Sequence, residues 1–255
     1  MSANQILTEI AVFTPESALT AAAAGANRIE LCSGYAEGGL SPSAATIQYV
    51  KTKVNIPVHV MIRPRTGDFV YSETEKEIIL QDIAFCKSAG VEGVVLGALS
   101  PHGGIDKEFT ARAVKEAHPM EVTFHRAFDL CSDLSGALED LITCGVKRVL
   151  TSGGKPTVIL GEKEIAELVD QAADRIIILP GGGIQADTIT AFIKNTGVKE
   201  IHFSAKRLIK GKAKEKKGIK LTAEGEVSDY TWYECDGEKV KAMREVLSEV
   251  ELLNL

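Results

Sequence analysis

Short apolar runs alternate with stretches of helical character along the whole chain. Eight runs have the length and the apolar, β-branched composition typical of buried strands. They are Ile6–Phe13, Arg28–Ser33, Pro57–Pro64, Gly93–Ser100, Glu121–Asp129, Arg148–Gly154, Ile176–Gly183 and Glu200–Lys206. The regular alternation predicts a repeated strand–helix unit.

Capping residues mark several of the helices between these runs. Thr14 followed by Pro15 predicts a helix start, and Ser72 with Glu75 forms the pattern of a capping box. A helix is expected from Asp133 to Gly145. Further helices are expected over Glu162–Ala173, Ala186–Asn195 and Asp236–Leu253.

One short pattern recurs where a helix passes into the next strand. A glycine is followed by one apolar or small residue, two further residues and the start of the strand, beginning at Gly25, Gly90, Gly145 and Gly197. Glycine favours the left-handed conformation that ends many helices. The repetition indicates one βα unit used many times.

Eight strands alternating with helices over about 250 residues predict a single (β/α)₈ TIM-barrel domain spanning residues 1–255. A doubly wound open sheet is the alternative. A Lys-rich segment at about 208–222 interrupts the pattern before the last helix, and GKAKEKKGIK forms its core. It predicts a solvated basic loop or, alternatively, a lid over a charged ligand.

The stretch HVMIRPR carries polar residues inside a run that should be buried. In a barrel the outward face of each strand packs against helices, so Val58, Val60 and Ile62 are expected to point outward. His59, Met61 and Arg63 then point into the barrel.

The same alternation places other polar side chains inside. The expected interior set is Glu9, Glu30, His59, Arg63, His125 and His202, with Cys32 and Thr151 beside it. Glu30, His59, Arg63, His125 and His202 are expected to line one cavity at the C-terminal side, with Glu9 near its floor. Most barrel interiors are aliphatic, and buried charges are costly unless paired or used. A self-neutralised network and a functional site are both consistent with this set.

Glycine-rich segments follow the sixth and seventh strands. Gly181-Gly182-Gly183 ends the seventh strand, and Ser204-Ala205-Lys206 ends the eighth. Barrels often bind phosphate with the loops after these two strands, because helix N-termini and backbone N–H groups favour anions. The predicted ligand-binding residues are Glu9, Arg65, Thr151, Gly182, Gly183, His202, Ser204 and Lys206. Tight turns alone are the structural alternative.

Charge and cysteine content narrow the range of partners and compartments. The formal net charge is −6, which argues against nucleic acid or an anionic membrane as the main partner. The first residues lack the basic region of a secretory signal, and no apolar run approaches the ~18 residues that span a bilayer. Five scattered cysteines without a CxxC pair indicate reduced thiols and a cytoplasmic protein.

Several long stretches together resemble the CutC family of copper homeostasis proteins. They are ELCSGYAEGGLSPS, PVHVMIRPRTGDFVYS, VTFHRAFD, RVLTSGG, LPGGGI and EIHFSA. The resemblance runs from about Ile6 to Lys206 and includes the final helix. It implies a TIM barrel, a cytoplasmic location, a homo-oligomer for which a dimer is expected, and a role in copper homeostasis through Cu(I) binding.

Two classes of function remain open on the residues themselves. Cu(I) prefers sulfur and imidazole donors, and Cys32 and Met61 are the inward sulfur ligands, with His59 and His125 expected nearby. The alternative is an enzyme acting on a small anionic or phosphorylated metabolite. There the candidate catalytic residues are His59, His125, Glu30 and Arg63, with histidine as acid or base and Arg63 orienting the ligand.

Overall fold

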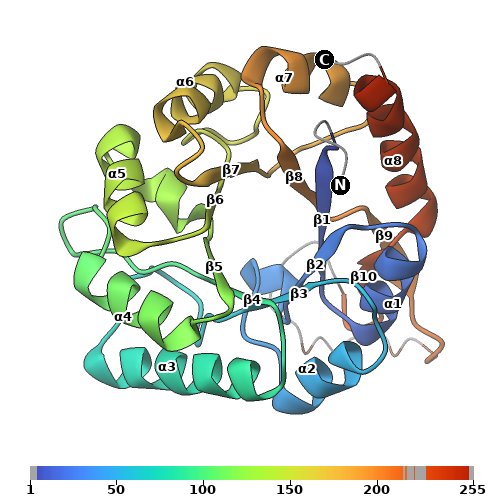
Figure 1. Ribbon diagram of the computed structural model, residues 1–255. Coiled ribbons are helices and arrows are strands. Elements are labelled where there is room, and N and C mark those ends of the chain that lie inside the picture. The colour runs from blue at the N-terminus through green and yellow to red at the C-terminus, as the bar shows by residue number, and fades with distance from the viewer. Residues whose placement is uncertain (1–4, 215, 217–220, 222–227, 253–255) are drawn as a thin grey trace.

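The computed structural model describes residues 5–214, 216, 221 and 228–252. Eight parallel strands form its centre: β1 (Leu7–Val12), β2 (Arg28–Leu31), β3 (Val58–Met61), β4 (Gly93–Leu96), β5 (Glu121–Phe124), β6 (Arg148–Thr151), β7 (Ile177–Pro180) and β8 (Glu200–Phe203). Each strand pairs with its neighbour in sequence, and β1 pairs with β8. A bridge between Gly181 and His202 joins the end of β7 to β8, which closes the barrel seen in Figure 1. The predicted TIM barrel is confirmed.

Helices surround the sheet on its outer side (Figure 1). They are α1 (Pro15–Ala23), α2 (Ala44–Lys51), α3 (Glu73–Ser88), α4 (Lys107–Ala117), α5 (Leu134–Cys144), α6 (Glu162–Ala172), α7 (Ile189–Thr196) and α8 (Gly237–Leu252), with short 3-10 turns η1 (Tyr35–Glu37) and η2 (Arg126–Leu130). The Thr14 cap, the Ser72–Glu75 capping box and the Asp133 cap are confirmed. Helix α7 begins three residues later than predicted.

The glycines of the recurring pattern have the predicted left-handed backbone. Their φ angles are +93° at Gly25, +73° at Gly90, +81° at Gly145 and +68° at Gly197. Side chains rarely adopt this conformation, whereas glycine does so without steric cost. The four positions therefore end a helix and turn the chain back toward the next strand, as expected.

The alternation of side chains along the strands separates two cores. Val58, Val60 and Ile62 belong to the large apolar layer between strands and helices. Cys32, Met61 and Val95 form a separate small cluster, against which Phe13 packs. The predicted outward and inward faces of β3 are confirmed.

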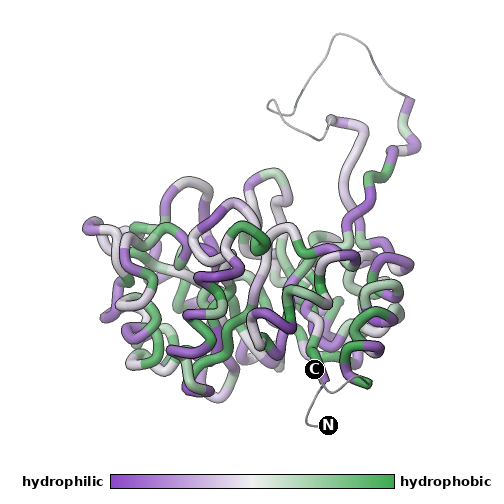
Figure 2. Tube along the Cα trace, turned by 90° about the horizontal axis from the view of Figure 1, so that it is seen from above, coloured by the Kyte–Doolittle hydropathy of each residue, from purple (hydrophilic) through white to green (hydrophobic). Residues whose placement is uncertain are grey.

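Two further strands follow the barrel. β9 (Lys206–Lys210) and β10 (Thr231–Cys235) pair as an antiparallel hairpin. Figure 2 shows this hairpin rising from one end of the barrel. The predicted Lys-rich loop thus begins within a strand, and half of its remainder lies outside the described residues. None of the described helices has both the length and the hydrophobicity needed to cross a bilayer.

Candidate functional site

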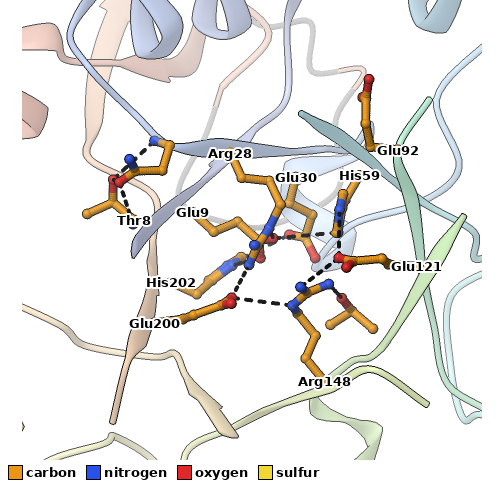
Figure 3. Close-up of polar contacts among 12 residues, drawn as sticks. Thr8, Glu9, Arg28, Glu30, His59, Glu92, Glu121, Arg148, Glu200 and His202 are labelled. Atoms are coloured by element: carbon orange, nitrogen blue, oxygen red, sulfur yellow. Dashed lines mark hydrogen bonds and ion pairs between the residues drawn. The ribbon is translucent and has the colours of Figure 1, made fainter. Parts of the chain in front are cut away.

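A chain of buried charges crosses the floor of the barrel, at the N-terminal ends of the strands (Figure 3). Arg28 binds Glu9 through Nε, and its Nη2 donates to Glu200 Oε2 at 2.6 Å. Arg148 donates to the same Glu200 oxygen at 3.3 Å and to Glu121 Oε2 at 2.7 Å. Both guanidiniums are therefore shared between two carboxylates, which is the arrangement that buried charges require.

His59 belongs to this floor and not to the predicted cavity at the opposite end. Its Nδ1 lies 3.9 Å from Glu9 Oε2, and its Nε2 lies 3.9 Å from Glu121 Oε2. It lines a pocket of about 540 Å³ at the N-terminal end, together with Arg28 and Glu121. Burial lowers the pKa of His59 to about 3, so the ring is neutral. The ring fits because Gly93 opposite it has no side chain: a Cβ there would lie 2.6 Å from the imidazole.

Glu9, His202 and Glu30 link the floor to the upper half of the barrel. His202 Nδ1 lies 2.8 Å from Glu9 Oε1, and its Nε2 lies 3.7 Å from Glu30 Oε2. Burial alone would raise the pKa of Glu9, but Arg28 and His202 outweigh it and hold that pKa well below the ordinary value. Burial opposes protonation of His202, but Glu30 and Glu9 raise its pKa. For Glu30, burial dominates and raises the pKa.

Above this layer lies a pocket of about 180 Å³, which we call the mouth pocket. Glu30, Arg63, His125 and His202 all line it, so four of the five side chains predicted to share a cavity do so. Its remaining walls are mainly apolar and sulfur-containing: Ala11, Phe13, Cys32, Met61, Phe69, Ala127 and Leu150, with Gly38 and Arg126. The mouth pocket therefore combines polar groups with hydrophobic walls, as ligand sites commonly do.

His125 enters the mouth pocket in a defined tautomeric arrangement. Its Nδ1 accepts a hydrogen bond from the backbone N–H of Ala127 at 3.1 Å. When Nδ1 is the acceptor, the neutral ring carries its proton on Nε2. Burial and the neighbouring Arg63 lower the pKa of His125 to about 3, so the ring stays neutral. Nε2 is buried and has no hydrogen-bond partner within the described protein. The missing side chain at Gly97 makes room for the ring.

Arg63 is fixed by the backbone of two loops. Its Nη1 donates to the carbonyls of Glu37 at 2.8 Å and Gly39 at 3.2 Å, and its Nη2 donates to that of Gly67 at 3.1 Å. The guanidinium also lies over the Phe69 ring, 4.9 Å from its centroid. Nε is buried and has no protein partner. The loops thus position Arg63 and leave its Nε–H without a partner.

Cys32 and Met61 meet beneath Gly39. A Cβ at Gly39 would lie 3.6 Å from both Cys32 Sγ and Met61 Cε, so the two side chains converge on one point. The Cys32 thiol lies 3.5 Å from Glu30 Oε2 and donates to it. Burial, followed by the nearby Glu30 carboxylate, raises the pKa of Cys32 well above its ordinary value. The thiol is therefore protonated at neutral pH.

A second and larger pocket of about 770 Å³, the side pocket, lies beside the barrel mouth. Gly182, Gly183, His202, Ser204 and Lys206 line it, which brings together most of the predicted ligand-binding residues. A helix N-terminus is present on one side only. After β7 the chain enters helix α7 at Ile189, six residues beyond Gly183, whereas β8 is followed by strand β9 and not by a helix.

Three predicted ligand-binding residues are already engaged within the protein. Lys206 binds the Tyr35 hydroxyl, and its ammonium lies 4.6 Å from the centroid of the Tyr233 ring. Arg65 binds Glu75 and donates to the carbonyls of its own loop. Thr151 was expected to point inward, but its hydroxyl donates to Asp129 at 2.5 Å. Thr151 follows Val149 on the outward face, whereas Leu150 between them lines the mouth pocket.

The sequence reasoning missed the other charged residues of the floor. These are Arg28, Glu121, Arg148 and Glu200, three of which are less than 7% exposed. A signal was present, because Arg28 lies two residues before Glu30 and Glu200 two before His202. Residues two apart on a strand share a face, so the alternation that placed Glu30 and His202 inside the barrel also places Arg28 and Glu200 there.

One group among the described residues has the spacing of metal ligands. Single donor atoms of Glu9, Glu30 and His202 lie within 4.8 Å of one another. Two carboxylates and one imidazole suit metals that prefer oxygen better than they suit Cu(I). Hydrogen bonding between His202 and Glu9 already accounts for their proximity.

Comparison with known proteins assigns the family. Residues 6–207 match the model of the CutC family. The mouse copper homeostasis protein cutC homolog is 42% identical over 97% of this chain and 91% of its own length, and the human homolog is 41% identical over 98% and 92%. The crystal structure of CutC from Streptococcus agalactiae superposes with a TM-score of 0.75 at 32% identity, covering 78% of this chain and 99% of that one. This chain belongs to the CutC family.

Proposed function

We propose that this chain acts in copper homeostasis, the role named for its mouse and human relatives, by binding Cu(I) at the barrel mouth. The observation that carries this proposal is the convergence of Cys32 and Met61 beneath Gly39, inside a pocket. Thiolate and thioether are the soft donors that Cu(I) prefers. The five cysteines are free, which supports a reducing compartment, and we propose the cytoplasm.

The rest of the donor set fits copper less well. The Cys32 thiol is protonated at neutral pH, so Cu(I) must displace its proton, and affinity should rise with pH. His125 Nε2 carries a hydrogen in the tautomer that Ala127 selects, so it is not free to ligate a metal. His59 lies in the floor. Copper binding therefore depends on the two sulfur atoms.

Titration with Cu(I) against a competing chelator tests this proposal. Cys32→Ser should weaken Cu(I) binding at least tenfold, and Met61→Leu should weaken it less, because the thiolate is the stronger donor. Cys144→Ser is the matched control, since Cys144 lies in α5, outside the pocket. Equal Cu(I) affinity in wild type and Cys32→Ser would rule out this site.

A second function is supported by a different observation, the cluster of polar atoms without partners in the same pocket. Glu30 Oε1, Arg63 Nε and His125 Nε2 are all buried and unsatisfied, and all three residues line the mouth pocket. Such clusters occur where a ligand completes the hydrogen bonding. We propose as the alternative an enzyme for a small anionic metabolite. In it Glu30, with its raised pKa, exchanges a proton, while Arg63 orients the ligand.

The two functions respond differently to the same substitutions. For the enzyme, Arg63→Lys should abolish stabilisation by the metabolite in a thermal-shift panel, and Cys32→Ser should leave it unchanged. For copper binding the pattern is reversed. A phosphate group in the side pocket stays a prediction, and the same panel with phosphorylated and unphosphorylated pairs tests it.

We also propose a homo-oligomer, most simply a dimer. Leu208 on β9 and Trp232 on β10 are 54% and 40% exposed, and the strand register places one on each face of the projecting hairpin. Light scattering coupled to size-exclusion chromatography measures the mass directly. Leu208→Ser with Trp232→Ser should shift the protein toward monomer if the hairpin forms the contact.

A further inference from the structure

We propose that the mouth pocket binds a small hydroxycarboxylic acid, whose carboxylate accepts hydrogen bonds from Arg63 Nε and His125 Nε2 and whose hydroxyl donates to Glu30 Oε1. This inference rests on the second proposed function and specifies its ligand. It assigns His125 as a binding residue that donates a hydrogen bond, in place of the acid or base role expected from the sequence.

The unsatisfied atoms carry the inference. In the described part of the chain, six buried side-chain atoms lack a hydrogen-bond partner, and three of them belong to residues of this one pocket. His125 is 5% exposed and Arg63 8%, so bulk water does not compensate them. A buried donor without a partner is costly and uncommon in folded proteins. A ligand with matching atoms removes that cost.

The donors are fixed before any ligand arrives. The backbone N–H of Ala127 occupies Nδ1 of His125, so Nε2–H is the donor that remains for a ligand. Three loop carbonyls accept hydrogen bonds from the Nη atoms of Arg63, so its Nε–H remains for a ligand. Phe69 contacts both, with its ring centroid 4.8 Å from that of His125 and 4.9 Å from the Arg63 guanidinium carbon. The two donors therefore share one apolar flank. Preorganised donors of this kind lose little entropy on binding.

The atoms offered by the pocket define the class of ligand. Two N–H donors, one of them cationic, suit a carboxylate, because hydrogen bonds between ionised groups are the stronger ones. A carboxylate oxygen of Glu30 accepts a hydrogen bond, so the ligand should carry a hydroxyl next to its carboxylate. At about 30 Å³ per water, a volume of 180 Å³ holds roughly six small groups. A hydroxy acid of two to four carbons matches this size.

Calorimetric titration with glycolate and lactate tests the proposal, with two matched probes that each lack one group. Propionate lacks the hydroxyl, and 1,2-propanediol lacks the carboxylate. We expect lactate or glycolate to bind, propionate to bind several-fold more weakly, and the diol not to bind. His125→Asn keeps an acceptor for the Ala127 N–H but shortens the donor, and Arg63→Lys keeps the charge without Nε. Each should weaken lactate binding about tenfold or more.

His102→Asn, at an exposed histidine, is the control and should bind like wild type. In the wild-type protein the imidazole ¹⁵N resonance of His125 should shift when lactate is added, so one readout needs no variant. The proposal is overturned if neither hydroxy acid binds, or if they bind without moving that resonance. If another metabolite binds in an Arg63-dependent way while the hydroxy acids do not, this inference fails and the enzyme proposal stands.

Discussion

The floor and the mouth of the barrel are both buried and both charged, but they differ in how completely their polar groups are paired. At the floor, Arg28 and Arg148 each bind two carboxylates. At the mouth, Arg63 and His125 each keep a buried donor without a partner. Buried charge alone therefore does not identify a site in this protein. A group of unsatisfied atoms in one pocket does, because a structural network can complete most of its hydrogen bonds and a binding site must wait for its ligand. Among the described residues the floor leaves one such atom, Nδ1 of His59, whereas the mouth pocket gathers three.

The floor also pairs its charges internally. Arg28 lies between Glu9 and Glu200, and Arg148 lies between Glu200 and Glu121. Figure 3 shows these side chains meeting across the barrel. The two guanidiniums and their carboxylates thus pair with one another within the protein, in agreement with the structural alternative that the sequence left open. This structural explanation holds for the floor, but it does not account for the unsatisfied atoms of the mouth pocket.

The largest expected effect comes from breaking the floor. Arg28→Met should lower the free energy of unfolding by about 3–5 kcal/mol, because Glu9 and Glu200 would lose a buried partner. Urea denaturation at pH 7 measures the loss. Arg175→Met is the matched control: its pair with Glu139 is exposed, so its loss should change the free energy of unfolding far less. Similar small losses in both variants would mean that the floor network does not stabilise the fold.

Alternation along the strands was enough to predict the barrel and the inward set from the sequence. It assigns each side chain to a face, and it placed Glu30, Cys32, Met61, Arg63 and His125 correctly. It does not by itself assign a height along the barrel axis. His59 precedes Arg63 by four residues, which is about 13 Å at the rise of a strand, so the two could not share a small cavity.

Other features depended on contacts that no local pattern specifies. Thr151 lies on the outward face by the same alternation as Val149, but its hydrogen bond to Asp129 of the neighbouring 3-10 turn could not be read from the strand. The segment after β8 pairs with β10, more than 20 residues away in sequence, so a strand forms where the Lys-rich loop was expected to begin. The partners that satisfy Arg63 are backbone carbonyls of two loops, and only the folded chain brings them together.

A smaller effect is the dependence of stability on pH, which should arise from the two buried histidines, His59 and His125. His59 and His125 have pKa values of about 3 in the folded protein, against about 6.5 when unfolded. Between these values the unfolded chain binds more protons, so stability is lost as pH falls below about 6.5. The loss should be about 2 kcal/mol per histidine between pH 6.5 and 5. His125→Asn should remove one share of it and His102→Asn none, as urea denaturation at pH 7 and 5 would measure.

The smallest expected effect concerns Glu30, which lies at the boundary between the two regions. Burial raises its pKa in the folded protein, so between its ordinary and its raised pKa the folded state binds more protons than the unfolded state. Its contribution to stability therefore declines as pH rises through that window. Glu30→Gln removes the ionisation and should be more stable than wild type at pH 8, with a smaller gain at pH 5.

Glu167→Gln, on the exposed face of α6, is the control variant. A gain for Glu30→Gln that grows with pH, combined with loss of hydroxy-acid binding, would show that the protein forgoes stability at Glu30 to keep a ligand acceptor. A stability loss at every pH would instead place Glu30 in the self-satisfied network, because His202 and Cys32 would then depend on its charge. Glu30 would then belong to the floor network, and Arg63 and His125 alone would keep unsatisfied atoms in the mouth pocket.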